Sequence, residues 1–147
     1  MANRIHRRIL VMSRKGGVGK SSIAGNLAVW LSGQGRRVGL LDIDIHGPSI
    51  PKLLRLEGTR LTAIDEKIEP VLYNDSLKVM SIAFMLSNPN EAVIWRGPMK
   101  HNMIQQFCDG VAWGDLDDLV VDCPPGTGDE ALSAVQVLGT IHGVVIV

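Results

Sequence analysis

The chain of 147 residues is poor in aromatic side chains and has no excess of either charge. Aromatic residues make up 4% of it, so its core must be built mainly from aliphatic side chains. Its 15 Lys and Arg residues balance 15 Asp and Glu residues, which argues against general coating of nucleic acid by bulk electrostatics. With 46% hydrophobic and 20% charged residues, the composition excludes a disordered tail, a collagen-like chain and a coiled-coil rod.

Cysteines and long apolar runs are also scarce. The two cysteines, Cys108 and Cys123, are too few and too far apart for a disulfide framework or a zinc cage, and they fit a reducing compartment. No apolar run approaches the roughly 18 residues that a membrane span needs. The apolar stretch after the basic N-terminus is too short for the core of a signal peptide. We therefore expect a cytoplasmic protein without a membrane span.

Short β-branched runs alternate with longer segments of helical periodicity along the whole chain. Strands are expected at residues 8–13, 37–42, 77–82, 119–122 and 143–147. Helices are expected at 20–34, at 98–112 and, after a capping-box pattern of Thr127 and Glu130, up to residue 138. Weaker patterns indicate a short helix at 52–56 and a β-hairpin at 68–73. The strands are apolar without alternation, so we expect an α/β fold with a mostly parallel sheet and helices on both faces, in one domain over residues 1–147.

The spacing of apolar residues also predicts which side of the first helix is buried. Ile23, Leu27, Trp30 and Leu31 recur at the spacing of one helical face. We expect this face to pack on the sheet.

A glycine cluster joins the first expected strand to the first expected helix. Glycines allow the dihedral angles of a tight loop and leave no Cβ in the way, so successive backbone N–H groups can surround a polyphosphate. Lys20 can reach the β- and γ-phosphates, and the Ser21 hydroxyl can bind Mg²⁺. A glycine-rich turn without a ligand is the weaker alternative. The predicted nucleotide-binding residues are Arg14, Lys15, Gly16, Gly17, Val18, Gly19, Lys20, Ser21 and Ser22, together with Gly126 in a downstream Pro-Pro-Gly-Thr-Gly switch loop.

Aspartates follow two of the other expected strands, at the edge where ligands bind in open α/β folds. Asp42 and Asp44 are two residues apart, so they share a face if the strand geometry persists. Asp122 ends an apolar strand, the Walker B arrangement that delivers a carboxylate to a Mg²⁺ shell. Like charges this close repel each other and favour a cation near them. Solvated loop acids are the alternative.

The glycine loop departs from the standard phosphate-binding pattern, because Arg14 stands where a glycine is usual and a second lysine, Lys15, follows it. This resembles the deviant Walker A loop of the MinD/ParA/nitrogenase-iron-protein class of P-loop ATPases. The resemblance implies that Lys15 crosses a dimer interface to the partner subunit's nucleotide, as an arginine finger does. It also implies that Asp44 orients or activates the attacking water and that Asp42 supports a Mg²⁺ shell with Ser21 and Asp122. Lys15, Lys20 and Asp44 are thus the expected catalytic residues.

Three further segments look like the Mrp/ApbC iron–sulfur cluster carrier ATPases, over nearly the whole chain. They are DIDIHGPSIP (42–51), WRGPMKHNMIQQF (95–107) and WGDLDDLVVDCPPGTGDE (113–130). The resemblance implies an ATPase with ATP and Mg²⁺ as cofactors that assembles or transfers iron–sulfur clusters as a nucleotide-linked homodimer. Its partners would be iron–sulfur apoproteins or scaffold proteins.

Such carriers need a Cys-x-x-Cys pair to hold a 4Fe–4S cluster, and this sequence has none. Cys108 and Cys123 are not spaced to supply it, so we expect both to be core residues. The last expected strand, GVVIV, needs further elements to cover it. The resemblance places the cluster cysteines and the base pocket beyond that strand. We therefore expect the chain to be the N-terminal part of a longer domain and to expose apolar surface when made alone.

Two other functions remain open. The first is a ParA- or MinD-like positioning ATPase that binds DNA or a membrane, which would need a basic surface patch or an amphipathic terminal helix. Outside the glycine loop, the only basic cluster is Arg4, Arg7 and Arg8. The second is a chain that binds a partner without hydrolysing ATP.

Overall fold

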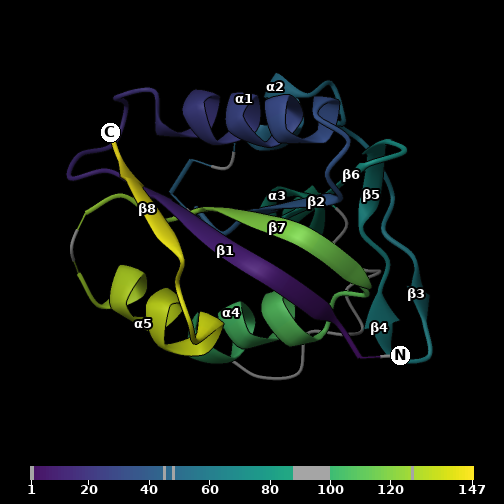
Figure 1. Cartoon of the computed structure of the whole chain (residues 1–147). Coiled ribbons are helices and arrows are strands. Elements are labelled where there is room, and N and C mark those ends of the chain that lie inside the picture. The colour runs from purple at the N-terminus through teal and green to yellow at the C-terminus, as the bar shows by residue number, and fades with distance from the viewer. Residues whose placement is uncertain (1, 45, 48, 88–99, 127) are drawn as a thin grey trace.

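The strands of the molecule form one six-stranded sheet in the order β5-β6-β2-β7-β1-β8 (Figure 1). This computed structural model describes residues 2–44, 46–47, 49–87, 100–126 and 128–147. The strands are β1 (Arg4–Met12), β2 (Val38–Asp42), β5 (Val71–Asn74), β6 (Leu77–Ser81), β7 (Asp115–Asp122) and β8 (Gly143–Ile146). Every neighbouring pair is parallel except β5 and β6. The expected mostly parallel sheet is confirmed.

Helices cover both faces of this sheet. Figure 1 shows α1 (Lys20–Gly33) on one side and α4 (Lys100–Asp109) with α5 (Asp129–Leu138) on the other. Two short helices, α2 (Ile50–Leu53) and α3 (Ile82–Ser87), follow β2 and β6. All five residues of β2 are buried, which explains why that strand is apolar without alternation. No helix in the described ranges is long and apolar enough to cross a membrane.

The buried face of the first helix matches the expected one only in part. The stripe in contact with the core contains Ala24, Ala28 and Leu31, whereas Ile23 and Trp30 are 41% and 61% exposed. The reason is Lys20, which begins the helix, is 5% exposed and points to buried carboxylates. Positions four, eight and eleven residues further along a helix lie on the same side as its first residue. The small alanines therefore face the sheet. Of the four residues expected on one buried face, Leu31 is buried and Leu27 packs against the core, so the prediction from apolar spacing was wrong only for Ile23 and Trp30.

Two strands begin earlier than expected because charged residues pair within the sheet. β1 starts at Arg4 instead of residue 8, and β7 starts at Asp115 instead of residue 119. In the added segments Arg7 lies opposite Asp118 and donates a hydrogen bond to it, so the polar positions are part of the ladder. Periodicity of apolar residues cannot detect strand segments of this kind.

Other boundaries also differ. The expected hairpin at 68–73 is replaced by two hairpins: β3 (Ala63–Ile64) pairs with β4 (Lys67–Ile68), and β5 pairs with β6. Helix α2 begins at Ile50, two residues before the expected start, and ends at Leu53. It does not continue to residue 56, because Arg55 has a φ of 57°, which helical residues do not adopt. Helix α5 ends at Leu138 as expected. Thr127 of the expected capping box and residues 98–99 of the expected helix at 98–112 lie outside the described residues.

Candidate nucleotide-binding site

The glycine loop runs from the carboxyl end of β1 to the start of α1. Gly17 and Gly19 have φ angles of 74° and 91°, in the region that favours glycine. No atom lies within 4 Å of the place where a Cβ would stand on either residue, so the inside of the loop is not filled by packing. The Ser13 hydroxyl donates a hydrogen bond to the Lys15 carbonyl at 2.7 Å and braces the turn into the loop. The loop is shaped by its backbone and is open to a ligand.

An open cavity of about 400 Å³ lies against this loop. It is lined by seven of the predicted residues, namely Gly16, Gly17, Gly19, Lys20, Ser21, Ser22 and Asp44. It is also lined by five residues that the sequence interpretation did not assign: His46, Gly47, Ser49, Leu53 and Pro125. Four of these lie in the segment just after Asp44, and one lies just after the Walker B strand. Their closeness in sequence to predicted site residues is the feature from which they could have been predicted.

The floor of the cavity is an ionic cluster around Lys20. Its Nζ lies 3.2 Å from Asp44 Oδ2 and also donates to Asp122 Oδ1. Burial lowers the pKa of Lys20, but the hydrogen bond and charge of Asp122, with the charge of Asp44, outweigh burial and raise the pKa above its ordinary value. The Ser21 hydroxyl donates to Asp122 Oδ2 at 2.6 Å. The structure thus brings together residues separated by about a hundred positions in the sequence.

Asp42 lies behind this cluster and is fully buried. It is the register partner of Asp122 across the β2–β7 ladder. Burial and the neighbouring charge of Asp122 raise the pKa of Asp42 to about 7. In the described part of the chain, Lys20 is the only cation that forms an ion pair with a carboxylate of this cluster, and it pairs with Asp44 and Asp122. The three aspartates therefore have one lysine between them, and this excess of negative charge fits a divalent cation.

The chemistry of the donor set agrees with Mg²⁺ bound together with phosphates. No group of three or more His, Cys, Asp and Glu side chains in the described residues is arranged to hold a metal ion by itself. Mg²⁺ usually takes only one or two carboxylates and completes its octahedron with phosphate oxygens, hydroxyls and water. Ser21 and Asp122 supply a hydroxyl and a carboxylate that already lie within hydrogen-bond distance.

Four of the ten predicted nucleotide-binding residues lie outside the cavity lining. Arg14, Lys15 and Val18 are exposed, and neither basic side chain makes an ion pair or side-chain hydrogen bond with the residues that the structure describes. The Gly126 N–H donates to the Ser13 carbonyl at 2.8 Å, which ties the loop after Walker B to the glycine loop. Their assignment to nucleotide binding remains a prediction.

The two cysteines are placed in the core, and neither lines this cavity. Cys108 is 8% exposed and Cys123 is fully buried. Burial raises the pKa of each thiol to about 12, so both stay protonated at neutral pH. Thiolate is the form that binds iron, and these residues do not fit as cluster ligands.

A parallel sheet with a glycine loop that leads into a buried lysine, and with a Walker B aspartate on the next strand, defines a P-loop nucleotide-binding protein. Comparison with known families gives the same class. The chain belongs to the family described as ParA: NUBPL iron-transfer P-loop NTPase, which matches residues 4–147.

Individual relatives fall within the same family. The chain is 51% identical over 143 residues to an iron–sulfur cluster carrier protein of Saccharolobus solfataricus, covering 97% of this chain and 48% of the relative. It is 52% identical over 132 residues to the cytosolic Fe-S cluster assembly factor NUBP2 of Rattus norvegicus, covering 88% and 49%. A nucleotide-binding protein of Archaeoglobus fulgidus, solved in complex with ADP, is 46% identical with a TM-score of 0.82, covering 97% and 54%. The chain spans about half the length of these relatives.

Proposed function

We propose that this chain binds ATP with Mg²⁺ and hydrolyses it as part of a cytoplasmic protein that assembles or transfers iron–sulfur clusters to apoproteins. The observation that carries the proposal is the Lys20, Ser21 and Asp122 cluster beneath the open glycine loop. The names of relatives that are about half identical, an iron–sulfur cluster carrier and a cytosolic assembly factor, support the cluster-related role.

The phosphates would lie on the backbone of residues 14–22, with Lys20 supplying charge. Loop N–H groups and the N-terminus of α1 favour an anion at this place. Ser21 and Asp122 would hold Mg²⁺, with Asp42 behind them. The ion, when bound, neutralises the charge that develops on the transferred phosphoryl group. Lys20 is paired with Asp44 and Asp122, so phosphate binding would exchange those partners for phosphate oxygens.

In this proposal Asp44 acts on the attacking water. It is 7% exposed, lines the cavity, and its two oxygens accept from Lys20 and from the His46 N–H. A fixed carboxylate at the cavity wall can orient an attacking water and accept its proton. Lys15 is exposed in the glycine loop, without a partner among the described side chains. In the proposed homodimer it would reach the nucleotide of the second copy, and turnover would be slow without that copy.

The cluster is cargo in this proposal, and the two cysteines of the chain do not hold it. Reconstitution with iron and sulfide tests that assignment. The 147-residue chain should gain no visible absorbance of a bound cluster, because its thiols are buried and protonated. A cluster bound through Cys108 or Cys123 would contradict it.

The alternative of a DNA- or membrane-positioning ATPase has less support. Arg7 of the N-terminal basic cluster forms an ion pair with buried Asp118, which already neutralises part of the charge that a nucleic acid or a lipid would use. Zero net charge points the same way.

The test is to compare Lys20→Ala with Asp44→Ala for ATP binding and hydrolysis in Mg²⁺. Lys20→Ala should lose ATP affinity by about a hundredfold or more, because a charged partner of the phosphates is removed. Asp44→Ala should keep binding and lose turnover by about a hundredfold or more. Asp75→Ala, at an exposed turn between β5 and β6, is the matched control. Unchanged hydrolysis in both site variants would contradict the proposal.

A further inference from the structure

A fully buried serine lies next to the candidate Mg²⁺ site. Ser81 ends β6, where it is the register partner of Asp42 on β2. Its hydroxyl donates a hydrogen bond to Asp42 Oδ2 at 2.8 Å, and its oxygen accepts the Ala83 N–H of α3 at 3.1 Å. The rest of β6 is apolar apart from Lys78. A hydroxyl at a buried strand end needs a partner, and here that partner is a carboxylate of the site.

The carboxylate of Asp42 is held from two sides. Oδ2 accepts from Ser81, and Oδ1 accepts the Asp44 N–H at 3.1 Å. In the described part of the chain no other side chain donates to Asp42. Ser81 therefore fixes the plane of a carboxylate that in turn holds the backbone of Asp44, the proposed catalytic residue.

The nature of the donor matters. A serine hydroxyl is neutral, so it orients the carboxylate without cancelling its charge. An arginine at the same place would satisfy both oxygens and leave little negative charge for a cation. The contrast with Asp118, which is buried between Arg7 and Arg36, shows that this fold also uses the second solution.

We propose that Ser81 is a positioning residue for Mg²⁺, acting through Asp42. This rests on the proposed function, in which Asp42 and Asp122 support the ion. Groups that orient metal-site carboxylates typically contribute about 10–100-fold to metal affinity. Because Ser81 does not touch the cavity, its loss should change the response to Mg²⁺ and leave the phosphate-binding loop intact.

The experiment separates these two effects with a fluorescent nucleotide, N-methylanthraniloyl-ADP. It is first titrated in EDTA, and Mg²⁺ is then added to the complex. We expect Ser81→Ala to bind the nucleotide in EDTA within about twofold of wild type and to need about tenfold more Mg²⁺ for the half-maximal change. Ser81→Thr, which keeps the hydroxyl, should restore most of the difference. Ser32→Ala removes another buried hydroxyl, one that donates to the Val29 carbonyl, and should leave the Mg²⁺ midpoint unchanged.

A double-mutant cycle with Asp42→Asn tests whether Ser81 acts through Asp42. If it does, Ser81→Ala should move the Mg²⁺ midpoint of Asp42→Asn by less than about twofold, since the interaction is already lost. A wild-type midpoint in Ser81→Ala, or two fully additive effects, would overturn the proposal. If Ser81→Ala does not fold, Ser81→Cys replaces it as a weaker donor of similar size, and an unchanged midpoint there would also overturn it. Failure of the wild-type chain to bind the nucleotide at all would instead refute the proposed function.

Discussion

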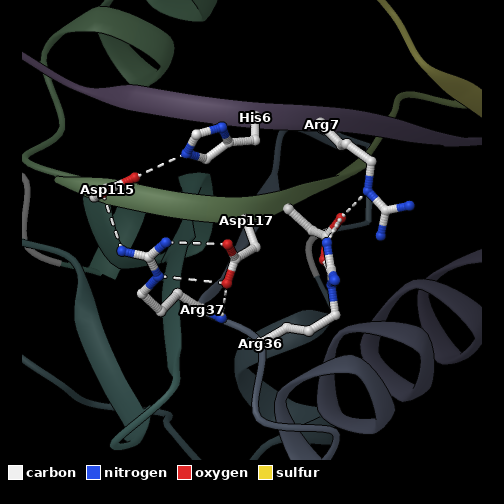
Figure 2. Close-up of polar contacts among 7 residues, drawn as sticks. His6, Arg7, Arg36, Arg37, Asp115 and Asp117 are labelled. Carbon is white, nitrogen blue, oxygen red and sulfur yellow. Dashed lines mark hydrogen bonds and ion pairs between the residues drawn. The ribbon is translucent and has the colours of Figure 1, made fainter.

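The central strands carry three aspartates at each end of the sheet, and the two groups have different partners. At the amino-terminal end of β7, three arginines and a histidine meet the acids, as Figure 2 shows. At the carboxyl end, Asp42, Asp44 and Asp122 have Lys20 between them. The acids of the first group all lie on β7, and those of the second lie at the ends of β7 and its neighbour β2, with Asp44 two residues beyond β2. The difference lies in the number of cations.

The amino-terminal group is matched in charge. Arg37 lies between Asp115 and Asp117, with nitrogen–oxygen distances of 3.0 Å to each (Figure 2). Asp118 accepts from Arg7 and Arg36. The hydrogen bond from Arg37 lowers the pKa of Asp117 to about 2. Burial raises the pKa of Asp118, but its two arginines outweigh burial and the net pKa is lowered. These pairs connect β1, the start of β2 and β7, so they stabilise the sheet and leave no charge for a ligand.

The group at the carboxyl end has fewer positive than negative charges. Burial and the negative charge of Asp122 raise the pKa of Asp42 to about 7. A buried acid held at a raised pKa costs stability unless a cation joins it. Such a local loss of folding stability is typical of sites that bind a ligand. The same residue type therefore has a structural role at one end of the sheet and, in the proposed function, a chemical role at the other. Removing single partners from each end tests that difference.

The largest effect on stability should be the pH dependence that Asp42 produces in metal-free protein. Between its ordinary value of 3.8 and about 7, the folded state binds more protons than the unfolded state. Stability should therefore fall as pH rises through this window, by up to roughly 4 kcal/mol at 1.36 kcal/mol per pH unit. Urea unfolding in EDTA at several pH values measures it. Asp42→Asn should remove most of this slope, whatever its effect on absolute stability; an unchanged slope would contradict the assignment.

A smaller loss should follow from Asp118→Asn at the other end. This leaves two arginines around a buried amide, and breaking a fully buried ion pair costs about 3–5 kcal/mol. Because Arg7 and Arg36 are 48% and 38% exposed, we expect about 2–3 kcal/mol here. Chemical denaturation measures it, with Asp75→Asn as the exposed control. Nucleotide affinity of the folded variant should stay within about twofold, since additivity holds for distant sites. A large loss of affinity would mean that the two ends are coupled.

The acidic group at the carboxyl end of the sheet could be predicted from the sequence, because it is built from local motifs. Each motif of the site can be recognised from a few consecutive residues. These motifs are the glycine loop with Lys20 and Ser21, the Asp42 and Asp44 pair, and the Walker B aspartate. The apolar strands around them predict the parallel sheet. These features are readable because each depends on short spacing along one element.

The ion pairs at the amino-terminal end of β7 could not be predicted in this way. Arg7 and Asp118 are far apart in the chain and meet only through the β1–β7 register. In the sequence they look like solvated charges that interrupt a strand. The same holds for Ser81, whose role depends on its register partner Asp42. The buried face of α1 was predicted only in part for a related reason, since Lys20 orients that helix by a contact with another element. Residues whose importance comes from pairing between strands need the structure.

The smallest effect should come from Arg37→Gln, which removes the cation between Asp115 and Asp117. Asp117 has a lowered pKa, so it contributes stability above its ordinary value that is lost as pH falls through about 2. Without Arg37 that acid-side loss should become shallower, which is the opposite pH window and sign from Asp42. The pair is exposed, so the melting temperature at neutral pH should change little and the difference should shrink in high salt. The control is Arg4→Gln, because Arg4 is exposed at the same end of the sheet, on β1, and forms no ion pair with the described residues. A loss of stability as large as that of Asp118→Asn would show that exposed pairs at this end hold the sheet as firmly as the buried one.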